Sequence, residues 1–381
     1  MEVFMYYNDF KELKLSGLGM GNMRLPVLDN DSSKINEELA GKMLAFCLEN
    51  GINYFDTAYG YHGGNSEIVV GKLLKQYPRD SFYLATKFPS YDASLFTRMP
   101  EIFEEQLSKL QVEYFDFYLM HNVNHLNINL FVNPEKNALD YFYEQKEKGR
   151  IRHLGFSSHA DYDDLKKYLE AYGDHMEFCQ IQLNWLDWDF QDAKKRVELL
   201  KEYNIPIWVM EPVRGGKLAS LPDNYMDQLK PFRPDATSVE WCFRFLQAIP
   251  EVTMILSGMS NMEQLEENIK IFETKEPVTE EEKAVLFDIA KDMVNKNTLP
   301  CTACRYCTSY CPNNINIPEI IAAYNEDKMG GRDFRVPMLL NRTPEGQKPF
   351  DCVACRSCED VCPQDIKISE LMEELTNKFQ K

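Results

Sequence analysis

The sequence predicts an α/β fold, a (β/α)8 TIM barrel, followed by a small, mainly helical domain that is rich in cysteine. From about residue 15 to residue 275, short apolar runs alternate with amphipathic stretches. Eight strand-plus-helix units in about 260 residues match the size of a (β/α)8 barrel. The hydrophobic fraction of 44% is enough for a packed core. Eight of the eleven cysteines come after residue 300, which marks the last part of the chain as a different domain.

The expected strands are short, apolar and rich in β-branched or aromatic residues, as strands buried on both faces are. Seven of them are Ile52–Thr57, Phe82–Thr86, Phe115–Met120, Ile151–Phe156, Phe178–Leu183, Ile205–Met210 and Val252–Leu256, and a glycine-rich eighth is Leu15–Met20. Helical patterns between them cover Asn36–Glu49, Pro100–Leu110, Ala138–Lys148, Tyr162–Ala171 and Asp189–Tyr203. A doubly wound sheet is the alternative, but no G-x-G-x-x-G follows the first strand.

Three segments are expected along the chain. The barrel takes residues 1–275, a linker helix takes 276–297, and the cysteine-rich domain takes 298–381. The boundary is placed by the charged stretch Glu273–Lys283, which leads into a helical pattern that ends near Asn295.

Charge and the N-terminal sequence exclude several classes of partner. The formal net charge of −18 leaves no basic face for a phosphate backbone, so we expect no nucleic-acid partner. The first seventeen residues have neither the basic nor the apolar region of a signal peptide, and no apolar run is long enough to span a bilayer. We therefore expect a cytoplasmic chain without a membrane partner and without disulfides. Cys47, Cys179 and Cys242 lie among apolar neighbours and are expected in the core.

The remaining cysteines form two runs, CTACRYCTSYCP and CVACRSCEDVCP, each with the spacing C-x2-C-x2-C-x3-C-P. Zinc usually takes two separated C-x2-C pairs, whereas these runs resemble the bacterial ferredoxin pattern for two [4Fe–4S] clusters. That resemblance implies crossed ligation, in which one cluster is bound by Cys301, Cys304, Cys307 and Cys362, and the other by Cys352, Cys355, Cys358 and Cys311. Forty residues separate Cys311 from Cys352, more than in compact ferredoxins, and this favours a mainly helical ferredoxin-like domain.

Four polar residues follow expected strands, at the rim where barrel active sites are built. They are Asp56 and Tyr61 in FDTAYGY, Lys87 in ATK and His121 in LMH, and Asn65-Ser66-Glu67 comes shortly after the first pair. In this order and spacing they resemble the catalytic tetrad of the aldo-keto reductase family, and the resemblance covers about residues 15 to 275.

The resemblance implies an NAD(P)-dependent oxidoreductase that reduces a carbonyl or oxidises an alcohol. Tyr61 would supply the proton, although the usual pKa of tyrosine, about 10, is high for that role. Lys87 would stabilise the tyrosinate, Asp56 would pair with Lys87, and His121 would orient or polarise the carbonyl.

The same resemblance implies a set of cofactor contacts. GFSSH is similar to the family's G-x-S-N and QIQLN to its Q-x-x-x-N, which places Ser157, Ser158 and Gln180 at the nicotinamide carboxamide. EPVRGGK resembles the S-P-x-x-G-G loop around the pyrophosphate and contains Glu211, Arg214, Gly215, Gly216 and Lys217. Beyond the last strand, the expected contacts are Ser260, Gln264, Glu267 and Asn268. Met210 replaces the usual stacking aromatic, and the basic residues for a 2′-phosphate are absent, so we expect NADH to be preferred or poorly discriminated.

We expect the two clusters to pass electrons to or from the barrel site. Because hydride carries two electrons and each cluster carries one, three alternatives stay open. In the first, the barrel is a simple reductase and the clusters are structural or dock a redox partner protein. In the second, the barrel is a redox-sensing binding subunit. In the third, a barrel-bound flavin links hydride to the clusters. The substrate is expected to be a small carbonyl or alcohol, and the substrate loops are expected at Asn122–Pro134 and Leu221–Arg233.

Overall fold

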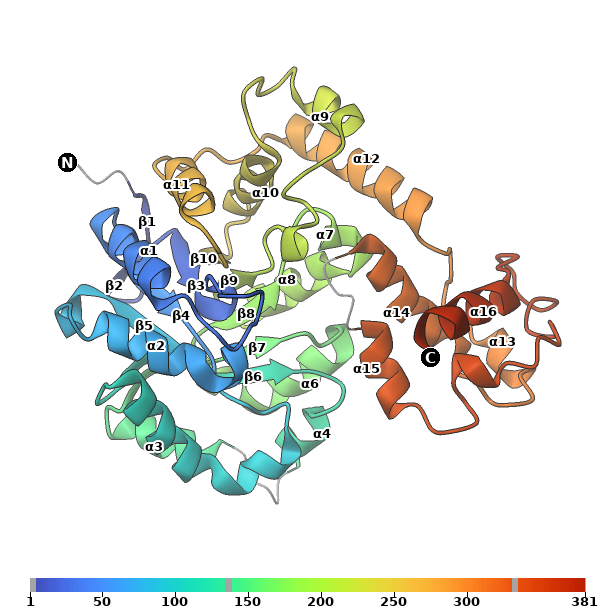
Figure 1. The fold of residues 1–381 in the computed structure, drawn as a ribbon, viewed down its shortest axis with the longest axis horizontal. Coiled ribbons are helices and arrows are strands. Elements are labelled where there is room, and N and C mark those ends of the chain that lie inside the picture. Colours follow the sequence, from blue (N-terminus) through green and yellow to red (C-terminus); the bar gives the residue numbers. More distant parts are fainter. Residues whose placement is uncertain (1–4, 134–138, 331–334, 381) are drawn as a thin grey trace. The chain divides into compact units, whose positions relative to one another are not determined.

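The structure is a computed structural model, and it describes residues 5–133, 139–330 and 335–380. Eight parallel strands close into a barrel in the order β10-β3-β4-β5-β6-β7-β8-β9, which confirms the predicted fold (Figure 1). The strands are β3 Leu18–Gly21, β4 Tyr54–Asp56, β5 Tyr83–Phe88, β6 Phe115–Val123, β7 Ile151–Ser158, β8 Cys179–Gln182, β9 Ile207–Met210 and β10 Val252–Ser257.

An antiparallel hairpin of β1 (Tyr7–Phe10) and β2 (Leu13–Ser16) precedes the barrel. The ring of Phe10 packs on Phe117 and Trp208, near the starts of β6 and β9, with centroid distances of 5.7 and 5.0 Å. The hairpin therefore closes the N-terminal end of the barrel and leaves the opposite rim for function.

The predicted strand Leu15–Met20 is wrong as a single element. It covers the end of β2 and most of β3, and the break between them falls at Gly17. A Cβ atom at Gly17 would collide with the ring of Tyr6, so the backbone passes against that ring as it leaves the hairpin. The sequence pattern gave no sign of this contact, because Tyr6 lies before the apolar run that contains Gly17.

Helices follow the barrel strands as the amphipathic patterns predict. They are α1 Glu37–Glu49, α2 Asn65–Leu74, α3 Met99–Leu110, α4 Ile128–Phe131, α5 Asp140–Glu147, α6 Tyr162–Tyr172, α7 Asp187–Phe190, α8 Ala193–Glu202, α10 Ser238–Gln247 and α11 Met262–Ile271. The predicted helix Asp189–Tyr203 is two helices, because Asp192 takes a left-handed conformation at φ 51°. Ala138 and Pro134, which the predicted helix and substrate loop include, lie outside the described residues.

Contacts divide the chain into two units, one of Met1–Pro212 with Asp235–Lys283 and one of Val213–Pro234 with Ala284–Lys381. Helices of the second unit are α9 Asp223–Leu229, α12 Glu280–Asn297, α13 Tyr306–Ser309, α14 Ile317–Met329, α15 Arg335–Arg342 and α16 Ile368–Phe379. Its apolar core includes Ile320, Ile321, Leu371 and Met372. The C-terminal domain is mainly helical, as the sequence predicts, whereas the predicted limits 1–275, 276–297 and 298–381 stay a prediction.

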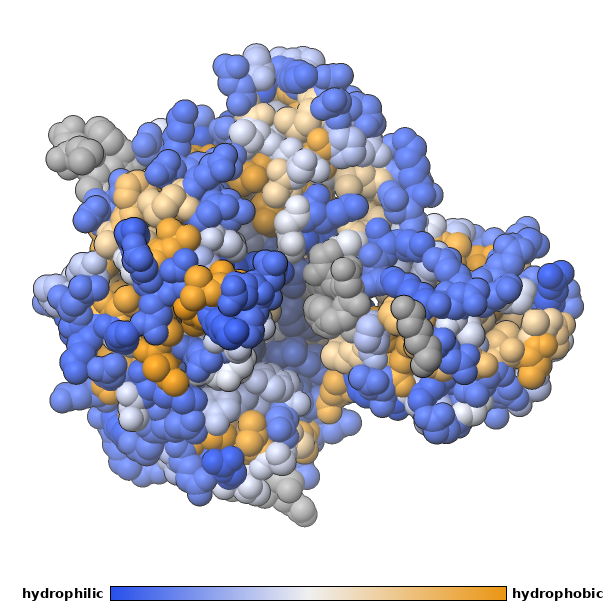
Figure 2. Space-filling view, in the orientation of Figure 1, coloured by the Kyte–Doolittle hydropathy of each residue, from blue (hydrophilic) through white to orange (hydrophobic). Residues whose placement is uncertain are grey.

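The face in Figure 2 is largely hydrophilic, and apolar residues form small separate groups on it. Within the described part of the chain, no helix is both long enough and apolar enough to cross a bilayer.

Glu177, just before β8, joins three elements near the N-terminal end of the barrel. Its carboxylate pairs with Lys11 of the hairpin turn and Lys146 of α5. It also lies 2.9 Å from Nδ1 of His153 and accepts from the backbone N–H of Leu154 at 3.1 Å. Burial alone would raise the pKa of Glu177, but these hydrogen bonds hold it well below its usual range.

This carboxylate should stabilise the barrel in a pH-dependent way. A pKa that is lower in the folded state gives stability above the unfolded-state pKa, about 4.3, and that stability is lost as pH falls through the folded-state value. We expect Glu177→Gln to lower the free energy of unfolding by about 2 kcal/mol at neutral pH, and the difference from wild type to shrink below pH about 4. Tryptophan fluorescence during denaturant unfolding measures this, because all four tryptophans lie in the first unit.

A surface carboxylate provides the control. Glu144 pairs with Lys148 on α5 while more than half of each side chain is exposed, so Glu144→Gln should change the free energy of unfolding by less than about 0.5 kcal/mol. Equal losses in the two variants, or a Glu177→Gln loss that persists in acid, would contradict the prediction.

Candidate functional site

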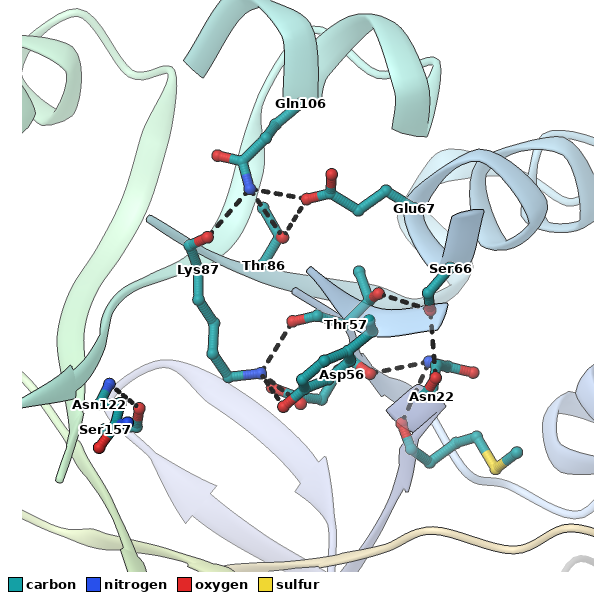
Figure 3. Close-up of polar contacts among 12 residues, drawn as sticks. Asn22, Asp56, Thr57, Ser66, Glu67, Thr86, Lys87, Gln106, Asn122 and Ser157 are labelled. Carbon is teal, nitrogen blue, oxygen red and sulfur yellow. Dashed lines mark hydrogen bonds and ion pairs between the residues drawn. The ribbon is translucent and has the colours of Figure 1, made fainter. Parts of the chain in front are cut away.

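The side chain of Lys87 lies at the centre of the barrel rim and is 0% exposed. Lys87 follows Thr86 in β5, and its ammonium donates to Oδ1 of Asp56 at 2.5 Å and to the carbonyl of Thr57 at 2.8 Å (Figure 3). The hydroxyl of Tyr61 lies 3.5 Å from the same nitrogen. An ammonium has three protons, and these three oxygens are three acceptors for them.

The ion pair keeps Lys87 charged in spite of its burial. Burial lowers the pKa of Lys87, but the charge of Asp56 and the hydrogen bonds of the ammonium to Asp56 and Tyr61 outweigh burial and raise the pKa above its usual value. For Asp56, burial raises the pKa and the Lys87 cation opposes that shift. The pair therefore places a fixed positive charge beside the Tyr61 hydroxyl.

Tyr61 keeps its proton at neutral pH. Burial raises the pKa of its hydroxyl, and the cation of Lys87 offsets only part of that shift. The sequence led us to expect that Lys87 would lower this pKa, and it did not reveal that burial of the Tyr61 hydroxyl would raise it. A protonated tyrosine beside a cation can act as a general acid whose conjugate base is stabilised.

His121, at the end of β6, is the fourth member of the group. Its ring centroid lies 5.8 Å from that of Tyr61. Burial, and then the charge of Lys87, lower the pKa of His121 well below its usual value, so the imidazole is neutral. Its Nδ1 is buried without a hydrogen-bond partner among the described residues. The structure therefore brings together all four predicted rim residues.

A left-handed turn positions Tyr61 in front of α2. Tyr61–Gly64 form a short 3-10 turn in which His62, Gly63 and Gly64 have φ values of 54°, 65° and 92°. Two of these three positions are glycines, which adopt such values at little cost. His62 is held by a 2.6 Å hydrogen bond between its Nδ1 and the carbonyl of Ser32.

The ends of β7 and β8 carry the residues expected at the nicotinamide carboxamide. Ser157 accepts from the backbone N–H of Asn122 at 2.8 Å. Ser158 already donates to the carbonyl of Val123 and accepts from the N–H of Ala160, both at 3.0 Å. Gln180 is 4% exposed, and its Oε1 is buried without a partner among the described residues. Gln180 thus fits an amide-bearing ligand, whereas the Ser158 hydroxyl is engaged with the backbone.

Within the second unit, the loop after β9 is tied down by Arg214. Its guanidinium is 0% exposed, and it donates to Oε2 of Glu326 at 2.8 Å and to the carbonyl of Gly330 at 2.6 Å. Gly215 and Gly216 have φ values of 65° and 103° in the same tight turn, and Lys217 at its end is exposed. The cation predicted to meet a pyrophosphate is therefore paired with a carboxylate of α14.

The residues expected at the adenosine end surround the start of α11. The N–H of Ser260 donates to Oε1 of Gln264 at 2.8 Å, and its hydroxyl donates to the carbonyl of Arg24 at 2.8 Å. Asn268 is buried and donates to Oγ of Ser257 at 3.1 Å. Glu267 is half-buried on the same helix.

Sequence reasoning missed Arg24 and the backbone carbonyl of Thr57. The side chain of Arg24 lies against Gly258, where a Cβ would come within 3.2 Å of it. The backbone carbonyl of Arg24 also accepts from the Ser260 hydroxyl, although the two residues are 236 positions apart in sequence. Neither residue carries a local signal: Thr57 acts through its main chain, and Arg24 is remote from the loop that it adjoins.

Two cavities in the second unit divide the eight C-terminal cysteines into sets of four. A cavity of about 320 Å³ is lined by Cys301, Cys304, Cys307 and Cys362. One of about 380 Å³ is lined by Cys311, Cys352, Cys355 and Cys358. Each set takes three cysteines from one run and the fourth from the other. In the described residues, no His, Cys, Asp or Glu group has the tight convergence of a single-ion site.

A barrel whose rim brings together Asp56, Tyr61, Lys87 and His121, and a second domain with two sets of four cysteines, fit an oxidoreductase, and comparison with known proteins gives the family. The aldo/keto reductase family matches residues 17–286, and the 4Fe-4S dicluster domain matches residues 300–366. The chain belongs to the aldo/keto reductase family, and it carries a C-terminal 4Fe-4S dicluster domain.

Individual relatives match the barrel part of the chain. The uncharacterized oxidoreductase YqkF of Bacillus subtilis is 26% identical over 74% of this chain and 95% of its own length. The NADH-specific methylglyoxal reductase of Escherichia coli is 25% identical over 68% of this chain and 90% of its own. Among solved structures, the holo form of an aldo-keto reductase from Bacillus halodurans is 26% identical, with a TM-score of 0.61, and covers 75% of this chain and 96% of its own.

Proposed function

We propose that this chain uses a nicotinamide cofactor to interconvert a small-molecule carbonyl and the corresponding alcohol at the rim formed by Asp56, Tyr61, Lys87 and His121. The observation that carries the proposal is the buried Lys87 ammonium, which bonds Asp56 and lies 3.5 Å from the Tyr61 hydroxyl. The charge of Lys87 is already balanced by Asp56, so the same ammonium is placed to stabilise the tyrosinate that forms when Tyr61 gives up its proton.

The protein's own groups account for the proton. The chemistry that a reduced nicotinamide would supply, when bound, is a hydride for the carbonyl carbon. Tyr61 donates its proton to the carbonyl oxygen, and the Lys87 ammonium then stabilises the tyrosinate across 3.5 Å. Asp56 keeps that ammonium charged and in place. The neutral imidazole of His121 donates a hydrogen bond to the same oxygen, which orients it and disperses its developing charge.

For the cofactor we propose the contacts that the family resemblance implies, supported by one structural feature. The buried and unpaired Oε1 of Gln180 is an acceptor that the amide of a carboxamide would satisfy. The other proposed contacts are Ser157, Ser158, Glu211, Arg214, Gly215, Gly216, Lys217, Ser260, Gln264, Glu267 and Asn268. The name of the E. coli relative, an NADH-specific reductase, agrees with the absence of basic residues between Gly258 and Asn268.

The two cysteine-lined cavities support two [4Fe–4S] clusters with crossed ligands. We propose that Cys301, Cys304, Cys307 and Cys362 hold one cluster, and that Cys352, Cys355, Cys358 and Cys311 hold the other. Such clusters supply one-electron transfer to a redox partner protein, and a flavin would be needed to convert a hydride into single electrons.

The first prediction concerns the proton donor. Tyr61→Phe should cut carbonyl reduction by a factor of about 10² or more and leave the cofactor dissociation constant unchanged, because only the general acid is removed. Steady-state kinetics and fluorescence titration of the reduced cofactor measure the two quantities. Tyr59 lies two residues before Tyr61, and its hydroxyl donates to Glu105. Tyr59→Phe removes that hydroxyl and should keep wild-type turnover. Unchanged turnover in Tyr61→Phe would refute the proposed role.

The second prediction concerns cofactor preference. We expect NADH to bind as tightly as NADPH or more tightly, because a 2′-phosphate requires cations and the segment from Gly258 to Asn268 contains none. Titration of both reduced cofactors tests this. If NADPH binds more than about tenfold tighter, Arg24→Ala identifies the cause: loss of that preference would make Arg24, beside Gly258, the phosphate ligand.

The third prediction concerns the clusters. The anaerobically purified protein should contain about eight iron atoms per chain. Cys311→Ser and Cys362→Ser should each lose about half of them, from opposite clusters, because each cysteine lies in the cavity of the other run. Cys47→Ala, in the buried face of α1, should leave the iron content unchanged. Zinc in place of iron, or full iron content in Cys311→Ser, would rule out this ligand assignment.

A further inference from the structure

The first turn of α2 carries two buried polar side chains that the proposed chemistry leaves without a role. Ser66 and Glu67 are both 0% exposed, and they point to neighbouring strands of the barrel (Figure 3). The Ser66 hydroxyl lies 2.8 Å from Oγ1 of Thr57, at the end of β4, and donates to the carbonyl of Asn22 at 3.1 Å. Oε1 of Glu67 accepts from the hydroxyl of Thr86, in β5, at 2.6 Å.

Gln106 of α3 completes this arrangement, and a hydrogen bond from Tyr118 fixes the orientation of its side-chain amide. The hydroxyl of Tyr118 donates to Oε1 of Gln106 at 2.6 Å, so the Gln106 amide nitrogen must face the other way. That nitrogen donates to Oε1 of Glu67 at 2.6 Å and to the carbonyl of Lys87 at 3.0 Å. Glu67 is therefore the common acceptor of a buried network in which the direction of each hydrogen bond is set.

The network holds Lys87 through its main chain. Thr86 directly precedes Lys87, and Gln106 binds the Lys87 carbonyl. The Lys87 ammonium in turn donates to the carbonyl of Thr57, whose side chain is held by Ser66. Tyr61 lies in the turn that runs directly into α2. The start of one helix therefore fixes both partners of the 3.5 Å contact between Lys87 Nζ and the Tyr61 hydroxyl.

We propose that Glu67, supported by Ser66, is a positioning residue that fixes the Lys87 ammonium against the hydroxyl of Tyr61. The inference rests on the proposed function, since it concerns the same proton donor. Neither side chain reaches the reacting atoms, so both act through Lys87 and Thr57. A preorganised cation stabilises a developing anion far better than a mobile one, and a misplacement of about 1 Å can cost about 10²-fold in rate.

The decisive variant is Glu67→Ala, which leaves Thr86 and Gln106 without their shared acceptor. We expect kcat to fall about tenfold or more while the cofactor dissociation constant stays unchanged. The Lys87 cation opposes the rise of the Tyr61 pKa, so displacing the cation should raise that pKa. The alkaline limb of the kcat pH profile should therefore move to higher pH by about one unit. The tyrosinate absorbance of Tyr61, taken as the difference from the same background with Tyr61→Phe, should shift by the same amount.

Three further variants separate positioning from simple loss of packing. Thr86→Val keeps the shape of the residue and removes one donor to Glu67, so it should shift the limb in the same direction by less. Glu67→Gln retains an acceptor oxygen, so its kcat and the pH of its alkaline limb should stay close to those of the wild type. Glu105→Gln removes the exposed carboxylate that shares Lys109 with Glu67, and it should change neither quantity.

Each outcome bears on the proposal. A folded Glu67→Ala variant with the wild-type pH limb and the wild-type Tyr61 titration overturns it, as does a loss of kcat without either shift. If Glu67→Ala does not fold, Thr86→Val supplies the same comparison. An active Tyr61→Phe protein would instead refute the proposed function, and the absorbance titration, which needs no turnover, would still decide whether Glu67 positions Lys87.

Discussion

The rim depends on one constraint, the full burial of the Lys87 ammonium. A buried cation is stable only where its protons meet acceptors and its charge meets an anion, and removal of one partner of such a pair costs about 3–5 kcal/mol. Asp56, the Thr57 carbonyl and the Tyr61 hydroxyl meet that requirement. Two strand ends and one turn therefore have to converge on a single nitrogen, and that convergence assembles the site.

Burial also sets the protonation of the two groups beside the lysine. Desolvation disfavours charge on any group, so it raises the pKa of Tyr61 and lowers that of His121. Both side chains are neutral hydrogen-bond donors as a result, while the ion pair with Asp56 keeps Lys87 a cation. One dry environment thus yields two proton-bearing neutral groups and one fixed charge, which is the combination that carbonyl reduction requires.

The sequence could predict those parts of the fold and site that produce a periodic pattern or a local motif. Buried strands appear as apolar runs, and Asp56, Lys87 and His121 could be grouped because parallel strands end at one rim. Non-local and main-chain features could not be predicted. The Thr57 carbonyl has no side-chain signal, and the break at Gly17 depends on the ring of Tyr6.

Arg214 shows how a non-local contact can change the role that a sequence motif predicts for a residue. The sequence places Arg214 in a loop that resembles a pyrophosphate-binding segment, yet its guanidinium is buried against Glu326 and Gly330 of the cluster-bearing unit. An anion at this loop would have to compete with a buried carboxylate for that cation, which costs more than binding to an exposed side chain. The exposed Lys217 is free of that cost. If an anion binds at this loop, we therefore expect Lys217 to contribute more to its binding than Arg214, whose ion pair holds the loop in place.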